Sequence, residues 1–251
     1  MSELELLQRR LDEIQNPIGS DIQASLLACM EAAEQEQGGL SPAVVIKLVD
    51  DVIRLTEENL RLVDLNEEVH NLAITDELTG LKNRRAFDNV LDREVRKADR
   101  YNNPLSLVMM DIDRFKTYND KHGHPEGDSV LQCLARIMEN GVRQDIDFPV
   151  RYGGEEFAII LPETNLYGGM QAAEKLREAI EEQMKKDKLC SRDEDGKEIH
   201  KLLADITVSF GVATWEEGNT SDDFLRKADI ALYKAKEGGR NRVEVFREEV
   251  E

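Results

Sequence analysis

The sequence has little of several things, and each shortage excludes a class of protein. It has no apolar run long enough to cross a bilayer, and its mean hydropathy is -0.52, so we expect no membrane segment. Its first residues, MSELELLQRRLDEI, are charged and amphipathic, unlike a signal peptide. Three cysteines, Cys29, Cys133 and Cys190, lie far apart and form no metal-ligand pattern. These shortages predict a cytoplasmic location.

Positive charge is also scarce. Lys and Arg number 33 against 52 Asp and Glu, which gives a formal net charge of -19. Binding a nucleic-acid polymer requires clustered cations, so this balance argues against such a partner. It does not exclude a small anionic ligand, which needs only a few local cations or a metal ion. The 251 residues suffice for one large domain or two modest ones.

The chain begins with a region that is predicted to be helical from residue 1 to about 74. A first segment ends near Pro17, and Ser20 is typical of the N-cap of a second helix. Gly38 stops that helix, and Pro42 stands at the first position of a third. We therefore expect residues 1–74 to form an all-helical regulatory and dimerisation region ahead of a second domain, 75–251.

A heptad pattern runs through the last part of this region, about residues 42–74. Its a and d positions are Val45, Leu48, Val52, Leu55, Asn59, Leu62, Asn66, Val69 and Ala73. Asparagine at an a position weakens a coiled coil but fixes its register, usually as a parallel dimer. We expect a homodimer through the N-terminal helices. The alternative is an amphipathic helix packed on its own domain.

From residue 75 the pattern changes to alternating helices and strands. The periodicity predicts helices over 83–101, 125–140, 165–184 and 221–237, and strands over 105–110, 205–213 and 243–246. The stretch VRYGGEEFAIIL, 150–161, reads as a hairpin about a glycine turn. The sum is an α/β fold, a mixed sheet flanked by helices.

Acidic residues gather where two of these strands end. Asp111 and Asp113 follow the apolar run LSLVMM and fall on one face, and the hairpin turn offers Glu155 and Glu156. Carboxylates on neighbouring strand ends suit a hard divalent cation such as Mg²⁺. Asp113 serves either as a further ligand or only as support for the loop. The alternative is a solvated acidic rim that binds nothing.

Six motifs then resemble one family in its order along the chain. They are DELTGLKNRR (76–85), DIDRFKTYND (111–120), HGHPEGD (122–128), RYGGEEF (151–157), ITVSFGVA (206–213) and ADIALYKAKEGGRNRV (228–243). Over residues 74–247 the sequence resembles the GGDEF-domain diguanylate cyclases, in their GGEEF variant. The resemblance implies a fold like that of nucleotide cyclase and polymerase palm domains. It also implies an enzyme that joins two GTP molecules into cyclic di-GMP with Mg²⁺, or Mn²⁺, and releases pyrophosphate.

The resemblance assigns roles to individual residues. Asp111, Glu155 and the backbone carbonyl of Ile112 correspond to the metal ligands, and Glu156 to a second acid near the metals and the ribose. Glu155, Glu156 and Lys116 are the implied catalytic groups. The remaining matches are Asn119 and Asp128, which read guanine; Lys116, Lys236 and Arg240, which contact the triphosphate; and His124, at another position of the nucleotide pocket, where a role in helix initiation is an equal alternative.

One departure from the family concerns inhibition by product. Many members carry an Arg-x-x-Asp site just before the glycine motif. Here Asp147 takes the aspartate position, but Gln144 stands at the arginine position and Arg143 is one place early. In an extended backbone Arg143 would point elsewhere, since neighbouring residues face opposite sides. The alternative is a one-residue bulge that brings Arg143 round. The sequence therefore predicts a broken or displaced product site. A degenerate domain that binds GTP or cyclic di-GMP and signals by protein contacts is the alternative function, which the filled catalytic positions disfavour.

Overall fold

The computed structural model describes residues 42–185 and 206–248. The chain divides into two compact units between Asn71 and Leu72. The helices expected before residue 42 and the polar loop expected at 185–201 fall almost wholly outside the described residues. No helix in the described ranges is both long enough and apolar enough to span a membrane.

Helix α3, Pro42–Ile74, matches the third predicted helix from its first proline onward. Leu48, Leu55 and Leu62 follow one another at intervals of seven residues, and each is more than half exposed. Val49 and Ile53, by contrast, are fully buried. An exposed leucine repeat of this spacing is the surface that a partner helix would cover. The coiled-coil dimer stays a prediction.

The second unit is built on a five-stranded mixed sheet. Its strand order is β2(Phe148–Gly153), β3(Glu156–Pro162), β1(Leu105–Ile112), β4(Val208–Thr214) and β5(Val243–Val245). All neighbouring pairs are antiparallel except β4 and β5. Strand β1 is buried along its whole length at the centre of the sheet, as its unbroken apolar run predicts.

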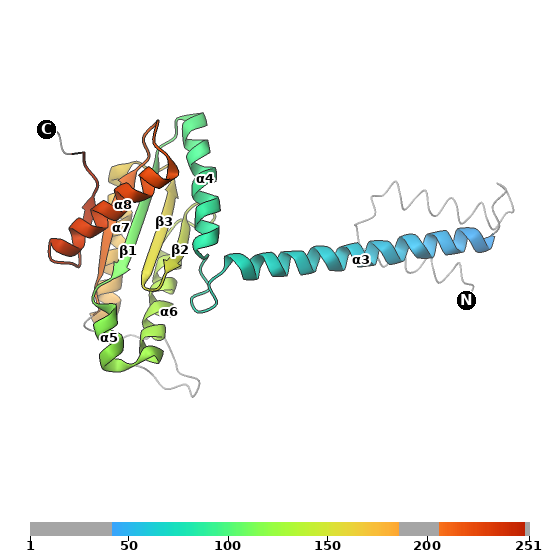
Figure 1. Cartoon of the computed structure of the whole chain (residues 1–251), viewed down its shortest axis with the longest axis horizontal. Helices are drawn as coiled ribbons and strands as arrows, with labels where there is room; N and C mark the ends of the chain where they lie inside the picture. Colours follow the sequence, from blue (N-terminus) through green and yellow to red (C-terminus); the bar gives the residue numbers. More distant parts are fainter. Residues whose placement is uncertain (1–41, 186–205, 249–251) are drawn as a thin grey trace. The chain divides into compact units, whose positions relative to one another are not determined.

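Helices cover both faces of the sheet, as Figure 1 shows. They are α4(Arg84–Tyr101), α5(Phe115–His122), α6(His124–Gly141), α7(Leu166–Lys185) and α8(Ser221–Glu237). Alternate β1 residues split between two cores, since Val108 and Met110 pack with α5, α6 and α7, whereas Leu107 and Met109 pack with α4 and α8. The predicted α/β fold is confirmed.

Two local details place the ends of elements that matter below. Helix α5 was not predicted, and it begins after Arg114, whose left-handed φ of 58° turns the chain out of β1. Gly211 lets α8 lie directly on β4, because a Cβ there would meet the Leu232 backbone nitrogen at 2.1 Å. This close approach fixes α8, whose last turn carries Lys236.

Candidate active site

The predicted acidic edge exists, at the ends of β1 and the β2–β3 turn. Asp111 lies opposite Glu156 in the strand register, and the Ile112 backbone N–H donates to the Glu155 carbonyl at 3.3 Å. Beside them lies a hollow of about 200 Å³. Its lining is Asp111, Ile112, Asp113, Arg114, Phe115, Lys116, Glu155, Lys236 and Arg240. Both predicted metal-binding carboxylates and all three predicted phosphate-binding cations therefore meet in one place.

Asp111 is buried at this edge, with 7% of its surface exposed. Burial raises the pKa of Asp111, and the nearby charges of Glu155 and Glu156 act in the same direction. The Lys236 ammonium opposes them, with its Nζ 2.8 Å from Asp111 Oδ2. Three neighbouring carboxylates face one lysine here, so the site favours the binding of additional positive charge.

Asp113 has a supporting role. Its carboxylate accepts hydrogen bonds from Thr207 Oγ1 and Ser209 Oγ, both at 2.7 Å, and from the Asn241 backbone N–H at 3.1 Å. These partners come from the start of β4 and from the turn after α8, where Arg240 and Asn241 both have left-handed φ angles. Asp113 thus fixes the turn that carries Arg240. The sequence singled out Asp113 but not these partners, although all three lie in the motifs quoted above.

The donor set fits a hard divalent cation. Among the described residues, no group of three or more His, Cys, Asp or Glu side chains could hold a metal ion. Two carboxylates, Asp111 and Glu155, with the Ile112 carbonyl are nevertheless a set that suits Mg²⁺, which usually takes few protein ligands and completes its shell with phosphate oxygens and water. Glu156 is exposed and does not line the hollow.

The predicted guanine-reading residues lie outside the lining of the hollow, on α5 and α6. Asn119 Oδ1 is buried and has no hydrogen-bond partner among the described residues. A Cβ on Gly127 would lie 1.9 Å from that oxygen, so the glycine makes room for it. A buried acceptor without a protein partner is open to a donor from a water molecule or a ligand. Asp128 and His124 are exposed near the start of α6.

At the other end of the hairpin, the backbone is not extended, so Arg143 does not point away from Asp147. Residues 144–146 form a turn rather than an extended segment, with Asp145 at a left-handed φ of 62°. Arg143 Nη2 therefore reaches Asp147 Oδ1 at 2.5 Å, and Arg143 Nε lies 3.0 Å from the same oxygen. The hydrogen bond to Asp147 raises the pKa of Arg143. Arg143 Nη2 also donates to the Pro162 carbonyl at 2.8 Å and to Thr164 Oγ1 at 2.9 Å.

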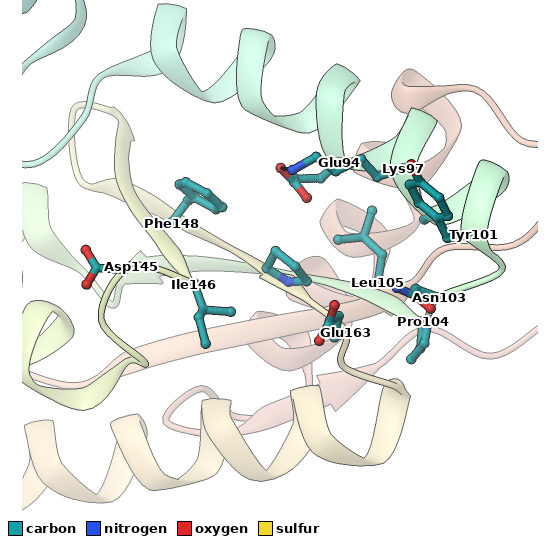
Figure 2. Close-up of a pocket in the computed structure, with 12 residues that line it drawn as sticks. Glu94, Lys97, Tyr101, Asn103, Pro104, Leu105, Asp145, Ile146, Phe148 and Glu163 are labelled. Carbon is teal, nitrogen blue, oxygen red and sulfur yellow. Dashed lines mark hydrogen bonds and ion pairs between the residues drawn. The ribbon is translucent and has the colours of Figure 1, made fainter.

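This pair lines a hollow of about 520 Å³ that Lys175 also lines. A second hollow, of about 490 Å³, lies beside the same turn. Figure 2 shows Glu94, Lys97 and Tyr101 of α4 on one side of it and Ile146 and Glu163 on the other. Lys97 Nζ is held 2.9 Å from Glu94 Oε1, so this cation already has a carboxylate partner.

The sheet is mixed, and its central strand ends in a buried aspartate beside a hairpin turn with paired acids. This arrangement defines a nucleotide-cyclase-like palm domain. The family model for the diguanylate cyclase GGDEF domain matches residues 73–242. The chain belongs to the GGDEF family.

Its relatives include several proteins named as cyclases. Diguanylate cyclase DgcP of Pseudomonas aeruginosa is 36% identical over 88% of this chain and 31% of its own length. The response regulator PleD of Caulobacter vibrioides is 41% identical over 68% of this chain and 36% of its own length. The chain thus spans about a third of these relatives.

Solved structures agree with the fold. The coiled coil and GGDEF domain of DgcB from Caulobacter crescentus, in complex with c-di-GMP, superposes with a TM-score of 0.70 and 34% identity, over 79% of this chain and 98% of that one. The active GGEEF domain of a Vibrio cholerae diguanylate cyclase gives a TM-score of 0.56 at 33% identity, over 66% of this chain and 98% of that one.

Proposed function

We propose that this protein is a diguanylate cyclase that acts in the cytoplasm as a homodimer, with Mg²⁺ or Mn²⁺, and condenses two GTP molecules into cyclic di-GMP and two pyrophosphates. The observation that carries the proposal is the single hollow where Asp111 and Glu155 meet Lys116, Lys236 and Arg240. Carboxylates for a metal beside cations for phosphate are what phosphoryl transfer requires.

The reaction balances as two identical displacements. The 3'-hydroxyl oxygen of one GTP bonds to the α-phosphorus of the other, the bond to pyrophosphate breaks, and the hydroxyl proton leaves. Lys116, Lys236 and Arg240 would hold the triphosphate and the charge that develops on the leaving pyrophosphate. A metal ion on Asp111, Ile112 and Glu155 would share that charge and lower the pKa of the attacking hydroxyl. Glu155, Glu156 and water are the candidate proton acceptors.

The base is selected by acceptors on α5 and α6. Guanine presents N1–H and N2–H₂ donors, and Asn119 Oδ1 and the Asp128 carboxylate are acceptors on neighbouring helices. Adenine has no donor at N1, so it would leave these acceptors unpaired. A site built to hydrogen-bond its substrate rejects an analogue that lacks the donor.

The homodimer follows from the stoichiometry. Each described domain brings one metal-bearing edge, and the reaction needs two GTP molecules face to face. The exposed leucine repeat of α3 supports pairing of two chains. Light scattering at micromolar concentration should therefore give a dimer, and a fully active monomer would contradict this part of the proposal.

The decisive experiment is incubation of purified protein with Mg²⁺ and GTP, with the products separated by chromatography. We expect cyclic di-GMP from GTP, none from ATP alone, and none from Glu155→Ala. A protein that binds GTP or cyclic di-GMP but turns over neither would instead be a degenerate signalling domain.

A further inference from the structure

Arg151, on β2, holds two parts of the domain with one guanidinium group. Its Nε and Nη2 donate to the Gly154 carbonyl at 3.0 and 2.9 Å. Its Nη1 donates to both carboxylate oxygens of Asp76, at 2.9 and 3.0 Å. The side chain is only 14% exposed. Both ends of the planar group are therefore engaged, in a geometry that a single ammonium cannot copy.

The Gly154 carbonyl belongs to the peptide group that joins Gly154 to Glu155. Gly154 has a left-handed φ of 45°, and the strand register shifts between Arg151 and Gly153, so the ladder alone does not fix this turn. The Glu155 carbonyl on the other side accepts from the Ile112 N–H. Arg151 and Ile112 thus hold the backbone of Glu155 from both sides.

Asp76, the other partner, belongs to the loop 75–83 that follows α3. Its carboxylate also accepts from the Thr79 N–H at 2.9 Å and from Thr79 Oγ1 at 2.6 Å. Asn83 closes the loop onto the last turn of α3, because its N–H donates to the Ile74 carbonyl at 2.9 Å and its Nδ2 to the Ala73 carbonyl at 3.0 Å. Asp76 thus stands two residues beyond the end of that helix.

We propose that Arg151 is a positioning residue that sets the Gly154–Glu155 peptide for metal binding, and that Asp76 makes this setting depend on the loop that closes the end of α3. The inference rests on the proposed function, since it assigns Glu155 to a metal. Its consequence is that a change at the end of α3 reaches the metal-binding turn through the Arg151 side chain, in addition to the backbone bond from the Arg151 N–H to the Lys82 carbonyl.

The test compares Arg151→Lys and Asp76→Asn with a matched control, Arg143→Lys. The control also removes a bidentate pair with an aspartate and a bond to a backbone carbonyl, but at the far end of the hairpin. Turnover is measured as initial rates with product removed. Mn²⁺ affinity is measured by electron paramagnetic resonance, with Mn²⁺ alone as the probe, and hydrogen exchange is followed at the amides of Ile112 and Glu155.

We expect Arg151→Lys to weaken Mn²⁺ binding and to lower kcat by about tenfold or more, the usual effect of removing a group that orients a metal ligand. Exchange at Glu155 should quicken, and melting temperature should change no more than in Arg143→Lys. Asp76→Asn should shift the same measurements in the same direction, and adding it to Arg151→Lys should change little.

Unchanged Mn²⁺ affinity and Glu155 exchange in Arg151→Lys would overturn the inference, as would equal losses in Arg143→Lys. If the native protein makes no cyclic di-GMP, the proposed function fails. The binding and exchange measurements then still decide whether Arg151 positions Glu155.

Discussion

Two arginine–aspartate pairs stand at opposite ends of the β2–β3 hairpin, and they differ in what they constrain. At the turn, Arg151 joins Asp76 to the Gly154 carbonyl; at the open end, Arg143 joins Asp147 to the Pro162 carbonyl. The Arg151 side chain is 14% exposed and the Arg143 side chain 45%. The first pair connects segments far apart in the sequence, whereas the second closes the local turn at residues 144–146. Only the first restrains a candidate metal ligand.

The two pairs differ in their consequences because each arginine also binds a different backbone carbonyl. Exposed pairs contribute little free energy. Arg143 lines a wide hollow, so it either contacts a ligand that binds there or has no part in ligand binding. The hydrogen bonds of Arg151 all go to the domain itself, from each of its three nitrogens, so its role is to hold the backbone in place.

The largest effect is expected at the turn end. Replacing Glu155 or Asp111 by Ala should lower cyclic di-GMP synthesis by about 10² to 10³-fold or more, because each removes charge that stabilises the transition state through the metal. Both side chains border a hollow rather than fill the core, so the melting temperature should shift little. Chromatography of the product and thermal unfolding measure the two quantities. Near-normal turnover by Glu155→Ala would remove the metal assignment.

The next effect tests the crowded approach of α6 to Asn119. Gly127→Ala would place a methyl group 1.9 Å from Asn119 Oδ1 and so displace the amide. We expect KM for GTP to rise by about tenfold, as when one hydrogen bond to a substrate is lost. Gly141→Ala, in the same helix, is the control, because its methyl would meet only Leu176. A greater rise in KM for GTP than for inosine triphosphate, which lacks the 2-amino group, would support a contact to the base through that group. Equal KM values for GTP in Gly127→Ala and Gly141→Ala would contradict the prediction.

A smaller effect is expected at the open end. Arg143 is tied to Asp147, Pro162 and Thr164, so we expect weak inhibition by added cyclic di-GMP in the native protein. Gln144→Arg would place a second guanidinium beside Asp147 at the family spacing, able to bind phosphate and guanine with two bonds. We expect inhibition to strengthen by about tenfold, the value of roughly one charge-assisted bond. Strong submicromolar inhibition of the native protein would show that Arg143 already acts as the product-binding arginine.

The sequence predicted the fold class, the acidic edge and the cations around it, because hydrophobic periodicity and motif spacing are local signals. It missed α5, which is only eight residues long and follows a left-handed Arg114 that no pattern announces. It left the direction of Arg143 open for a related reason, since no pattern distinguishes an extended segment from the turn that forms at 144–146, with Asp145 at φ 62°. It gave no role to Arg151, because Asp76 lies 75 residues away and their contact is a product of the tertiary fold.

The smallest expected effect concerns stability in acid at Asp76. Burial alone would raise the pKa of Asp76, but hydrogen bonds from Thr79 and Arg151 outweigh it and hold the pKa below its usual 3.8. The folded state therefore binds fewer protons than the unfolded state near pH 3.8. The stability that follows is present above the unfolded pKa and is lost as the pH falls through the folded pKa. Asp76→Asn should cost about 1.5 to 3 kcal/mol at neutral pH, the usual value of a hydrogen bond to a charged group.

That cost should shrink as the pH falls below about 3.8, because the native carboxyl then protonates and comes to resemble the variant. Urea unfolding at neutral pH and at about pH 3 measures both values. Glu77→Gln, at the exposed neighbouring carboxyl, is the control and should show no such dependence. A constant difference between native protein and Asp76→Asn at both pH values would mean that the charge on Asp76 contributes nothing to the link with Arg151, and would leave Arg151 holding the turn alone.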